Sequence, residues 1–195
     1  MHHHIYHTEG FVLGTKNRGE ANKVITIYTR ELGLLRASAQ GIRLAKSKSR
    51  FALQDFSYAK VDLVRGKEFW RVTSSTPVNS FPYLRRDKKS LSLIFQISKL
   101  LERLCAGEEA NEKIFDSLIQ TFYLLDNEDL DEKSREAMEL YLVFRIVYEL
   151  GYVGESENIA KYLGEEFNHT KIDSFLKERT SIVAHINKAL RESQL

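Results

Sequence analysis

The spacing of apolar residues changes once along this 195-residue chain, close to its two prolines. From residue 5 to about 80, apolar and polar residues alternate with a period of two, which is typical of β-strands. Beyond about residue 90, apolar residues recur every three or four positions, which is typical of amphipathic helices. Pro77 and Pro82 lie at the change, and proline ends regular elements. The sequence therefore predicts a β domain, residues 1–80, and an α-helical domain, residues 81–195.

Short turns divide the β domain into five predicted strands. They are placed at 5–13, 24–28, 34–42, 57–65 and 68–76, with a helical turn near 50–54 in the longer connection before the fourth strand. Five strands in about 75 residues leave no room for crossover helices, and a sheet of this size is best covered by closing into a small barrel. The predicted fold class is α+β, with a five-stranded OB-fold barrel followed by helices.

The alternation also assigns faces to the last two strands of the barrel. Ala59, Val61 and Leu63 share one face of the fourth strand, and Tyr58 lies on the other among charged neighbours. In the fifth strand Trp70 shares its face with Val72, whereas Phe69 lies on the opposite face. Trp70 is therefore predicted in the core, and Tyr58 and Phe69 are predicted at the surface.

Helical periodicity covers most of the second domain. Helices are predicted at about 91–105, 114–123 and 133–150, the last ending before Gly151. A C-terminal helix is predicted to begin at an N-cap, Thr170, and to extend to about Leu190.

Charge is divided unevenly between the two halves of the chain. Residues 1–89 carry 17 Lys and Arg against 7 Asp and Glu, a net charge of +10, while residues 90–195 carry 12 against 20, a net charge of −8. The basic half is the candidate for binding a polyanion. Its last four cations, Arg85, Arg86, Lys88 and Lys89, belong to the start of the helical domain, so the basic surface is predicted to cross the domain boundary.

The densest basic cluster lies between the third and fourth strands, where serines alternate with cations. Alone, such a run is typical of a solvated loop. Further cations and aromatic residues of the same barrel favour a nucleic-acid surface instead, because cations bind phosphates and aromatic rings stack on bases. The candidate DNA-binding residues are Arg43, Lys46, Lys48, Arg50, Arg36, Arg65, Lys67, Arg71, Tyr58 and Phe69.

Nothing in the sequence indicates catalysis, a cofactor or a membrane. No nucleophile, phosphate-loop or zinc-protease motif is present, and a nuclease needs clustered carboxylates where the barrel has scattered ones. The single cysteine, Cys105, excludes an intramolecular disulfide and any metal site with two or more cysteine ligands. No apolar run is long enough to span a bilayer, and no signal peptide is visible. We expect a non-enzymatic protein of the cytoplasm, with no metal.

Several segments resemble one known family. Residues 8–13, 19–29, 33–35 and 39–43 are similar in order and spacing to the N-terminal barrel of the RecO recombination mediators. Residues 81–87 and 144–152 resemble that family's entry into its helical domain and its central helix. Many RecO proteins follow the last segment with a four-cysteine zinc module, and residues 153–163 contain no cysteine, so no zinc site is expected here.

The resemblance implies a bacterial DNA repair protein that works on the nucleoid. Such a protein binds single- and double-stranded DNA, anneals complementary strands and, with RecR, helps RecA to replace the single-strand-binding protein SSB. The alternative from the residues alone is a generic OB-fold protein that binds single-stranded RNA, since barrels and basic loops do not distinguish the two nucleic acids.

The acidic helical domain is the candidate surface for protein partners. An apolar groove with a local cation would suit the acidic, Phe-ended tail of SSB, and Arg145 with Leu142 and Ile146 is a candidate lining. The alternative is that the aliphatic stem of Arg145 packs on its own helix.

Overall fold

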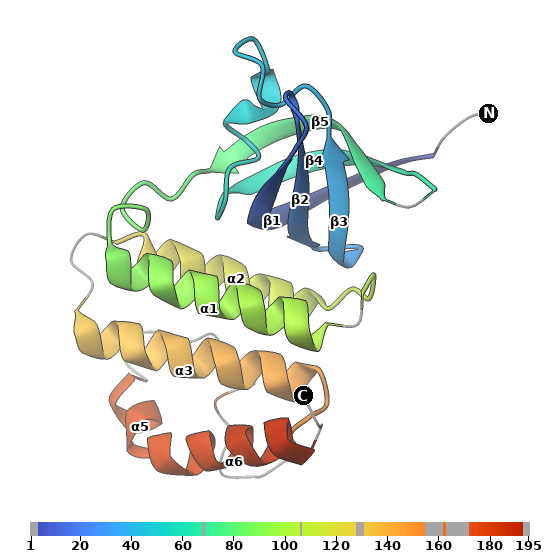
Figure 1. Ribbon diagram of the computed structural model, residues 1–195. Coiled ribbons are helices and arrows are strands. Elements are labelled where there is room, and N and C mark those ends of the chain that lie inside the picture. Colours follow the sequence, from blue (N-terminus) through green and yellow to red (C-terminus); the bar gives the residue numbers. More distant parts are fainter. Residues whose placement is uncertain are drawn as a thin grey trace. The chain divides into compact units, whose positions relative to one another are not determined.

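The computed structural model describes residues 4–67, 69–105, 107–127, 131–154, 162 and 172–192, and its strands precede its α-helices (Figure 1). The chain forms two compact units. The first contains Met1–Pro82 together with Cys105–Phe115, and the second contains Tyr83–Leu104 and Asp116–Leu195. The sequence did not indicate that a segment after the first long helix belongs to the barrel unit.

The five strands of the first unit close into a barrel. They are β1 (Ile5–Arg18), β2 (Asn22–Thr29), β3 (Gly33–Ala39), β4 (Tyr58–Arg65) and β5 (Trp70–Asn79), joined in the order β1-β2-β3-β5-β4. β1 pairs antiparallel with both β2 and β4, and a short parallel pairing of β3 with β5 completes the closure. The predicted α+β class with an OB-fold barrel is confirmed.

The barrel core follows the predicted alternation. Ala59, Val61, Leu63 and Trp70 all lie in one buried cluster with apolar residues of the other strands. Trp70 is 3% exposed, which confirms its place in the core, whereas Phe69 is 38% exposed on the other side. Burial of one face of every strand is the main stabilising contribution in a barrel of this size.

Strand ends differ from the prediction where backbone pairing outweighs side-chain polarity. β1 extends through the polar residues 14–18, because its backbone groups remain paired with β2 as far as Arg18, beyond a register shift near Gly14. β3 ends at Ala39 rather than 42, since Gly41 adopts a φ of 65°. β5 continues through Pro77, which pairs opposite Ala59 beside a register shift and thus costs little in ladder hydrogen bonds.

The segment 105–115 is held to the barrel by an aromatic cluster. Phe115 is fully buried, with its ring centroid 5.5 Å from that of Phe11, 6.4 Å from Tyr58 and 6.5 Å from Tyr28. The guanidinium of Arg30 lies 4.5 Å from the centroid of Phe115. Large aromatic rings contribute much of the stabilisation wherever they are fully buried. This segment therefore covers an outer face of the barrel that the alternation alone leaves open.

Polar contacts fix the same cluster. The carboxylate of Glu9 accepts hydrogen bonds from Arg30 Nε, at 2.9 Å, and from the Tyr58 hydroxyl, at 2.6 Å. Burial alone would raise the pKa of Glu9, but these hydrogen bonds outweigh it and hold the pKa below its ordinary value. Close by, Gly33 has a φ of 67°, and a Cβ at this position would overlap the backbone carbonyl of Glu109. Only glycine permits this close approach.

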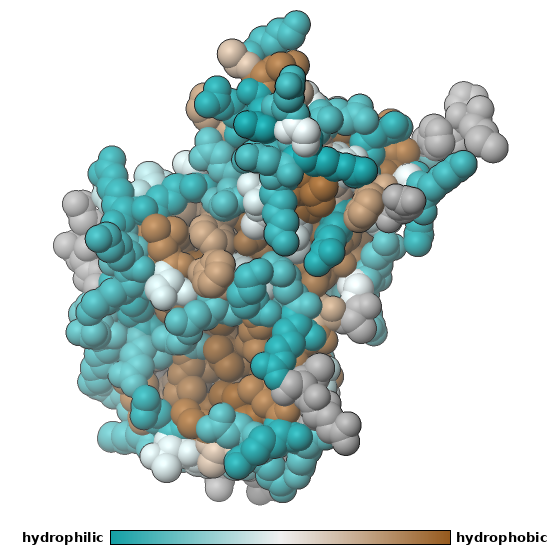
Figure 2. Space-filling view, viewed as in Figure 1, coloured by the Kyte–Doolittle hydropathy of each residue, from teal (hydrophilic) through white to brown (hydrophobic). Residues whose placement is uncertain are grey.

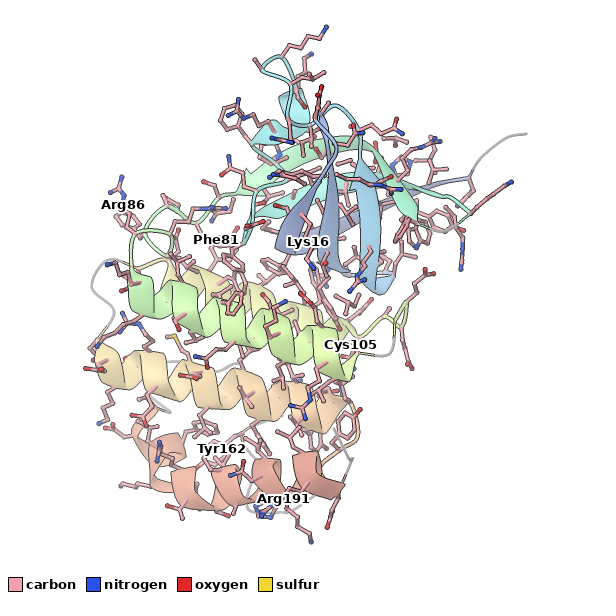
Figure 3. All side chains as sticks on the ribbon, in the orientation of Figure 1. Lys16, Phe81, Arg86, Cys105, Tyr162 and Arg191 are labelled. Carbon is pink, nitrogen blue, oxygen red and sulfur yellow. The ribbon has the colours of Figure 1, made fainter. Side chains whose placement is uncertain are left out.

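The helical unit is built around α3 (Glu132–Glu149), which packs against α1 (Lys88–Leu104) and against the C-terminal helices α5 (Ile172–Lys177) and α6 (Arg179–Glu192) (Figure 1). The remaining helix, α2 (Glu112–Leu125), begins in the segment counted with the barrel. The prediction of a single C-terminal helix is wrong, because a turn at Glu178 separates α5 from α6. The predicted N-cap, Thr170, lies outside the described residues. Tyr162, labelled in Figure 3, packs edge-on against Phe175 at 5.1 Å.

Candidate nucleic-acid interface

The basic connection between β3 and β4 is a structured loop. The Nη1 of Arg43 donates to the carbonyl of Gly19, at 2.9 Å, and its backbone N–H donates to Ala21, at 3.0 Å, so the base of the loop is fastened to the β1–β2 turn. A short 3-10 helix, η1 (Lys48–Arg50), lies in the loop, slightly before the predicted turn at 50–54. Leu53 follows it into the barrel core and is fully buried. The loop is thus anchored at both ends, and we call residues 43–56 the basic loop.

Three cations of the basic loop, Lys46, Lys48 and Arg50, are exposed, as predicted, and none makes an ion pair with another described residue. The loop protrudes from the barrel in Figure 1, and in Figure 2 hydrophilic and hydrophobic residues both lie on its surface. Exposed cations without carboxylate partners lose little by binding phosphate, because no internal ion pair has to be broken first. The loop is therefore suited to contact a nucleic-acid backbone.

The structure adds an aromatic residue that the sequence reasoning missed. Phe51 follows the last cation of the basic loop and is 67% exposed, and Leu44, near the start of the loop, is 46% exposed. An exposed phenylalanine beside three cations provides a ring on which a base can stack. The available signal was the position of Phe51 directly after Arg50, on a loop where apolar residues have no strand face to occupy.

The prediction that Tyr58 lies at the surface is wrong. Its side chain is 6% exposed, its ring stacks on Phe11 at 5.0 Å, and its hydroxyl donates to Glu9. The physical reason is that the outer face of β4 at this position is covered by Phe115, which comes from far along the chain. Tyr58 therefore has no ring face available for a base. The two candidates for stacking on bases are Phe51 and Phe69.

A second group of cations lies on the outer face of the sheet. The pairs Lys16 with Val24, Val24 with Ser38 and Ser38 with Arg71 form a row across β1, β2, β3 and β5. Arg36 lies in the adjacent row, opposite Thr26. Lys16, Arg36 and Arg71 are all exposed, and none of them pairs with a described acidic residue. We call the surface that carries these three cations the cationic face; Figure 3 labels Lys16 on the barrel.

Arg18 and Phe69 extend this cationic face. The guanidinium of Arg18 lies 5.6 Å from the ring centroid of Phe69, which is exposed at the β4–β5 turn. An arginine stacked on an aromatic ring keeps its charge available while the ring stays in place. OB-folds bind oligonucleotides on the β2–β3 face and its flanking turns. The row cations and Phe69 are on or next to that face here.

Two predicted cations of the β4–β5 turn differ from each other. Lys67 is exposed in the turn. Arg65 is exposed as well, but its Nη1 lies 3.4 Å from a carboxylate oxygen of Glu108. The charge of Arg65 is therefore partly neutralised within the barrel unit, unlike those of the basic loop.

The predicted partner groove in the helical unit is not present at the expected residues. Leu142 and Ile146 are fully buried, and Arg145 is 9% exposed, with Nη2 lying 3.2 Å from Glu149. The reason is the central position of α3, which has neighbouring helices on more than one side. The ion pair of Arg145 is with Glu149, one turn along the same helix. These three residues line no open surface.

The cations at the start of the helical unit are only partly available. Lys89 Nζ lies 2.7 Å from the carboxylate of Glu132, while Arg86 and Lys88 are exposed and Arg85 is half-buried. The predicted extension of the basic surface into this unit thus has at least one cation already paired.

The described residues were also compared with what a metal site, a reactive thiol and a membrane span would need. Among these residues no three His, Cys, Asp or Glu side chains are grouped so that they could hold a metal ion. Burial raises the pKa of Cys105 to about 11, so its thiol stays protonated near neutral pH. None of the described helices is both long and apolar enough to cross a membrane.

Comparison with known proteins identifies the family of this barrel. The family model for the N-terminal part of recombination protein O matches residues 1–81, a range that contains the five barrel strands. Proteins named DNA repair protein RecO match more of the chain: 33% identity over 137 residues in Alkaliphilus metalliredigens, and 32% over 148 residues in Pelotomaculum thermopropionicum. The chain belongs to the RecO family.

These RecO proteins are longer than the present chain. The two alignments cover 70% and 76% of this chain but 56% of each relative. A RecO protein of Dehalococcoides mccartyi is 31% identical over 140 residues, with 72% and 55% covered. The chain thus spans about half the length of the RecO proteins that it matches.

Replacing Phe51 with alanine tests the stacking site. We expect affinity for single-stranded DNA to fall about tenfold, because one stacked base contributes about 1–3 kcal/mol, and Phe51→Tyr to retain most of it. Affinity for duplex DNA should change less, since paired bases offer no free face. Fluorescence anisotropy with labelled single-stranded and duplex DNA measures both, and equal losses on the two would show that the ring does not stack.

Proposed function

We propose that this chain binds DNA with its barrel and acts in DNA repair and recombination. The observation that supports this most is a set of exposed cations that have no carboxylate partner among the described residues, in the basic loop and on the β1–β2–β3–β5 face, with Phe51 and Phe69 among them. The barrel itself is the part that matches the RecO family model. We assign no catalytic step to the chain.

The arrangement suits the pairing of two strands. Lysine and arginine side chains hold phosphates without reading bases, so the hydrogen-bonding edges of a bound strand stay free. Neutralised phosphates also repel those of an approaching strand less, because the repulsion depends on the uncompensated charge. We therefore propose that the chain binds single- and double-stranded DNA and promotes annealing of complementary strands.

Its protein partners follow from the same role. We propose that the chain acts with RecR on the nucleoid, contacts the C-terminal tail of SSB, and so helps RecA to load onto SSB-coated single strands. Because Leu142, Arg145 and Ile146 are buried, the SSB tail must bind elsewhere than at these residues.

Annealing of SSB-coated complementary oligonucleotides tests this function. We expect the chain to accelerate annealing, measured as the gain of energy transfer between labels on the two strands. A chain that binds DNA but leaves the annealing rate unchanged would contradict the mediator role and favour a generic binder.

The alternative function is binding of single-stranded RNA. Proteins distinguish RNA from DNA by contacts to the 2′-hydroxyl, and no residue of the barrel can be assigned such a contact. Competition between DNA and RNA oligonucleotides of one sequence separates the two. We expect DNA to compete at least as well as RNA, and a strong preference for RNA would favour the alternative.

A further inference from the structure

Two hydrogen-bond donors converge on one carboxylate where β4 ends and β5 begins. Trp70 Nε1 donates to Glu108 Oε1, at 2.7 Å, and Arg65 Nη1 lies 3.4 Å from Glu108 Oε2. All three residues belong to the barrel unit. Glu108 thus uses both of its oxygens on donors that come from neighbouring strands.

The barrel holds these donors in position. Arg65 and Trp70 are paired in the β4–β5 ladder, and the guanidinium of Arg65 lies 5.6 Å from the Trp70 ring centroid. The indole is 3% exposed and packs edge-on against Tyr6 at 5.0 Å. Guanidinium and indole N–H groups are donors without an acceptor function, and both bind carboxylate and phosphate oxygens. The pair is therefore a preorganised receptor for an oxyanion.

The carboxylate is the part of this arrangement that is easiest to replace. The side chain of Glu108 is 38% exposed and that of Arg65 is 68% exposed, so their ion pair is in contact with water and weak. Glu108 also comes from the segment 105–115, which is anchored mainly through Phe115, at its other end. Loss of the Glu108 contact would leave that anchor intact.

We propose that Trp70 and Arg65 form an anion subsite of the nucleic-acid interface, which Glu108 occupies in the unbound protein and a backbone phosphate of the bound strand takes by displacing it. The subsite lies at the β4–β5 turn, where Arg65 is exposed together with Lys67 and Phe69, two residues of the candidate interface. The inference rests on the proposed function, since its ligand is a nucleic-acid strand.

Glu108→Gln tests the subsite, with Glu109→Gln as the matched control. Glu109 is adjacent and exposed, and its carboxylate makes no ion pair with another described residue, so both variants change the net charge equally. We expect Glu108→Gln to bind labelled oligothymidylate about fivefold more tightly than the wild type, because the competing ion pair is gone, and Glu109→Gln to bind less than about twofold more tightly. In a protein that also carries Arg65→Gln, the gain from Glu108→Gln should disappear.

The tryptophan gives a second measurement. Trp70 is the only tryptophan of the chain, so its emission reports on its hydrogen bond to Glu108. Saturating the wild-type protein with oligothymidylate should shift the emission of Trp70. Saturating the Glu108→Gln variant should cause a smaller shift.

Three results would overturn the subsite while leaving DNA binding in place: equal gains from Glu108→Gln and Glu109→Gln, a gain that persists beside Arg65→Gln, or an emission that DNA does not change. Failure of every variant to bind DNA would overturn the proposed function, and the subsite with it.

Discussion

Replacing Lys46, Lys48 and Arg50 together with alanine is expected to weaken binding to single-stranded DNA about 100-fold at about 0.1 M salt. Each phosphate that a cation neutralises on a single strand contributes about 0.7 to the slope of log affinity against log salt, or about fivefold at this concentration. Three lost contacts should therefore also make the slope shallower by about 2. Anisotropy titrations over a range of salt concentrations measure both quantities.

The matched control changes the same charge in the other unit. Lys177, Lys188 and Arg191 are exposed on α5 and α6, and their triple alanine variant has the same net charge as the loop variant. We expect its affinity to fall less than about threefold. Equal losses from both variants would mean that DNA responds to total charge and not to the basic loop.

Replacing Phe115 with alanine is expected to destabilise the barrel unit by about 3–5 kcal/mol. The ring is fully buried among Phe11, Tyr28 and Tyr58, and its removal loses both the transfer free energy and the packing around the cavity that remains. Urea unfolding followed by Trp70 emission measures the change in the same unit. Phe51→Ala, which removes the same ring from an exposed position, should change stability by less than about 0.5 kcal/mol. A similar small change for Phe115→Ala would show that the segment 105–115 is not a structural part of the barrel.

The barrel was predictable because its strands bury one face each. Ala59, Val61, Leu63 and Trp70 lie in the core as the period of two requires, and the five strands lie close to their predicted positions. Strand ends were less predictable, because β1 and β5 are extended by backbone pairing that polar residues and even Pro77 do not interrupt.

The candidate site was predictable in its charges but not in all of its rings. Lys46, Lys48, Arg50, Arg36 and Arg71 are exposed, since cations without partners remain in water wherever the fold permits. Tyr58 and Arg145 were misplaced for one shared reason: each lies where a distant segment covers a second face of its element. Alternation along one strand or helix carries no information about such a covering segment.

The dependence of DNA binding on salt tests most directly whether the barrel binds a nucleic-acid backbone. With about six phosphates contacted by the basic loop and the cationic face, the plot of log affinity for single-stranded DNA against log salt should have a slope near −4. Binding that does not change with salt would contradict a phosphate-contacting interface.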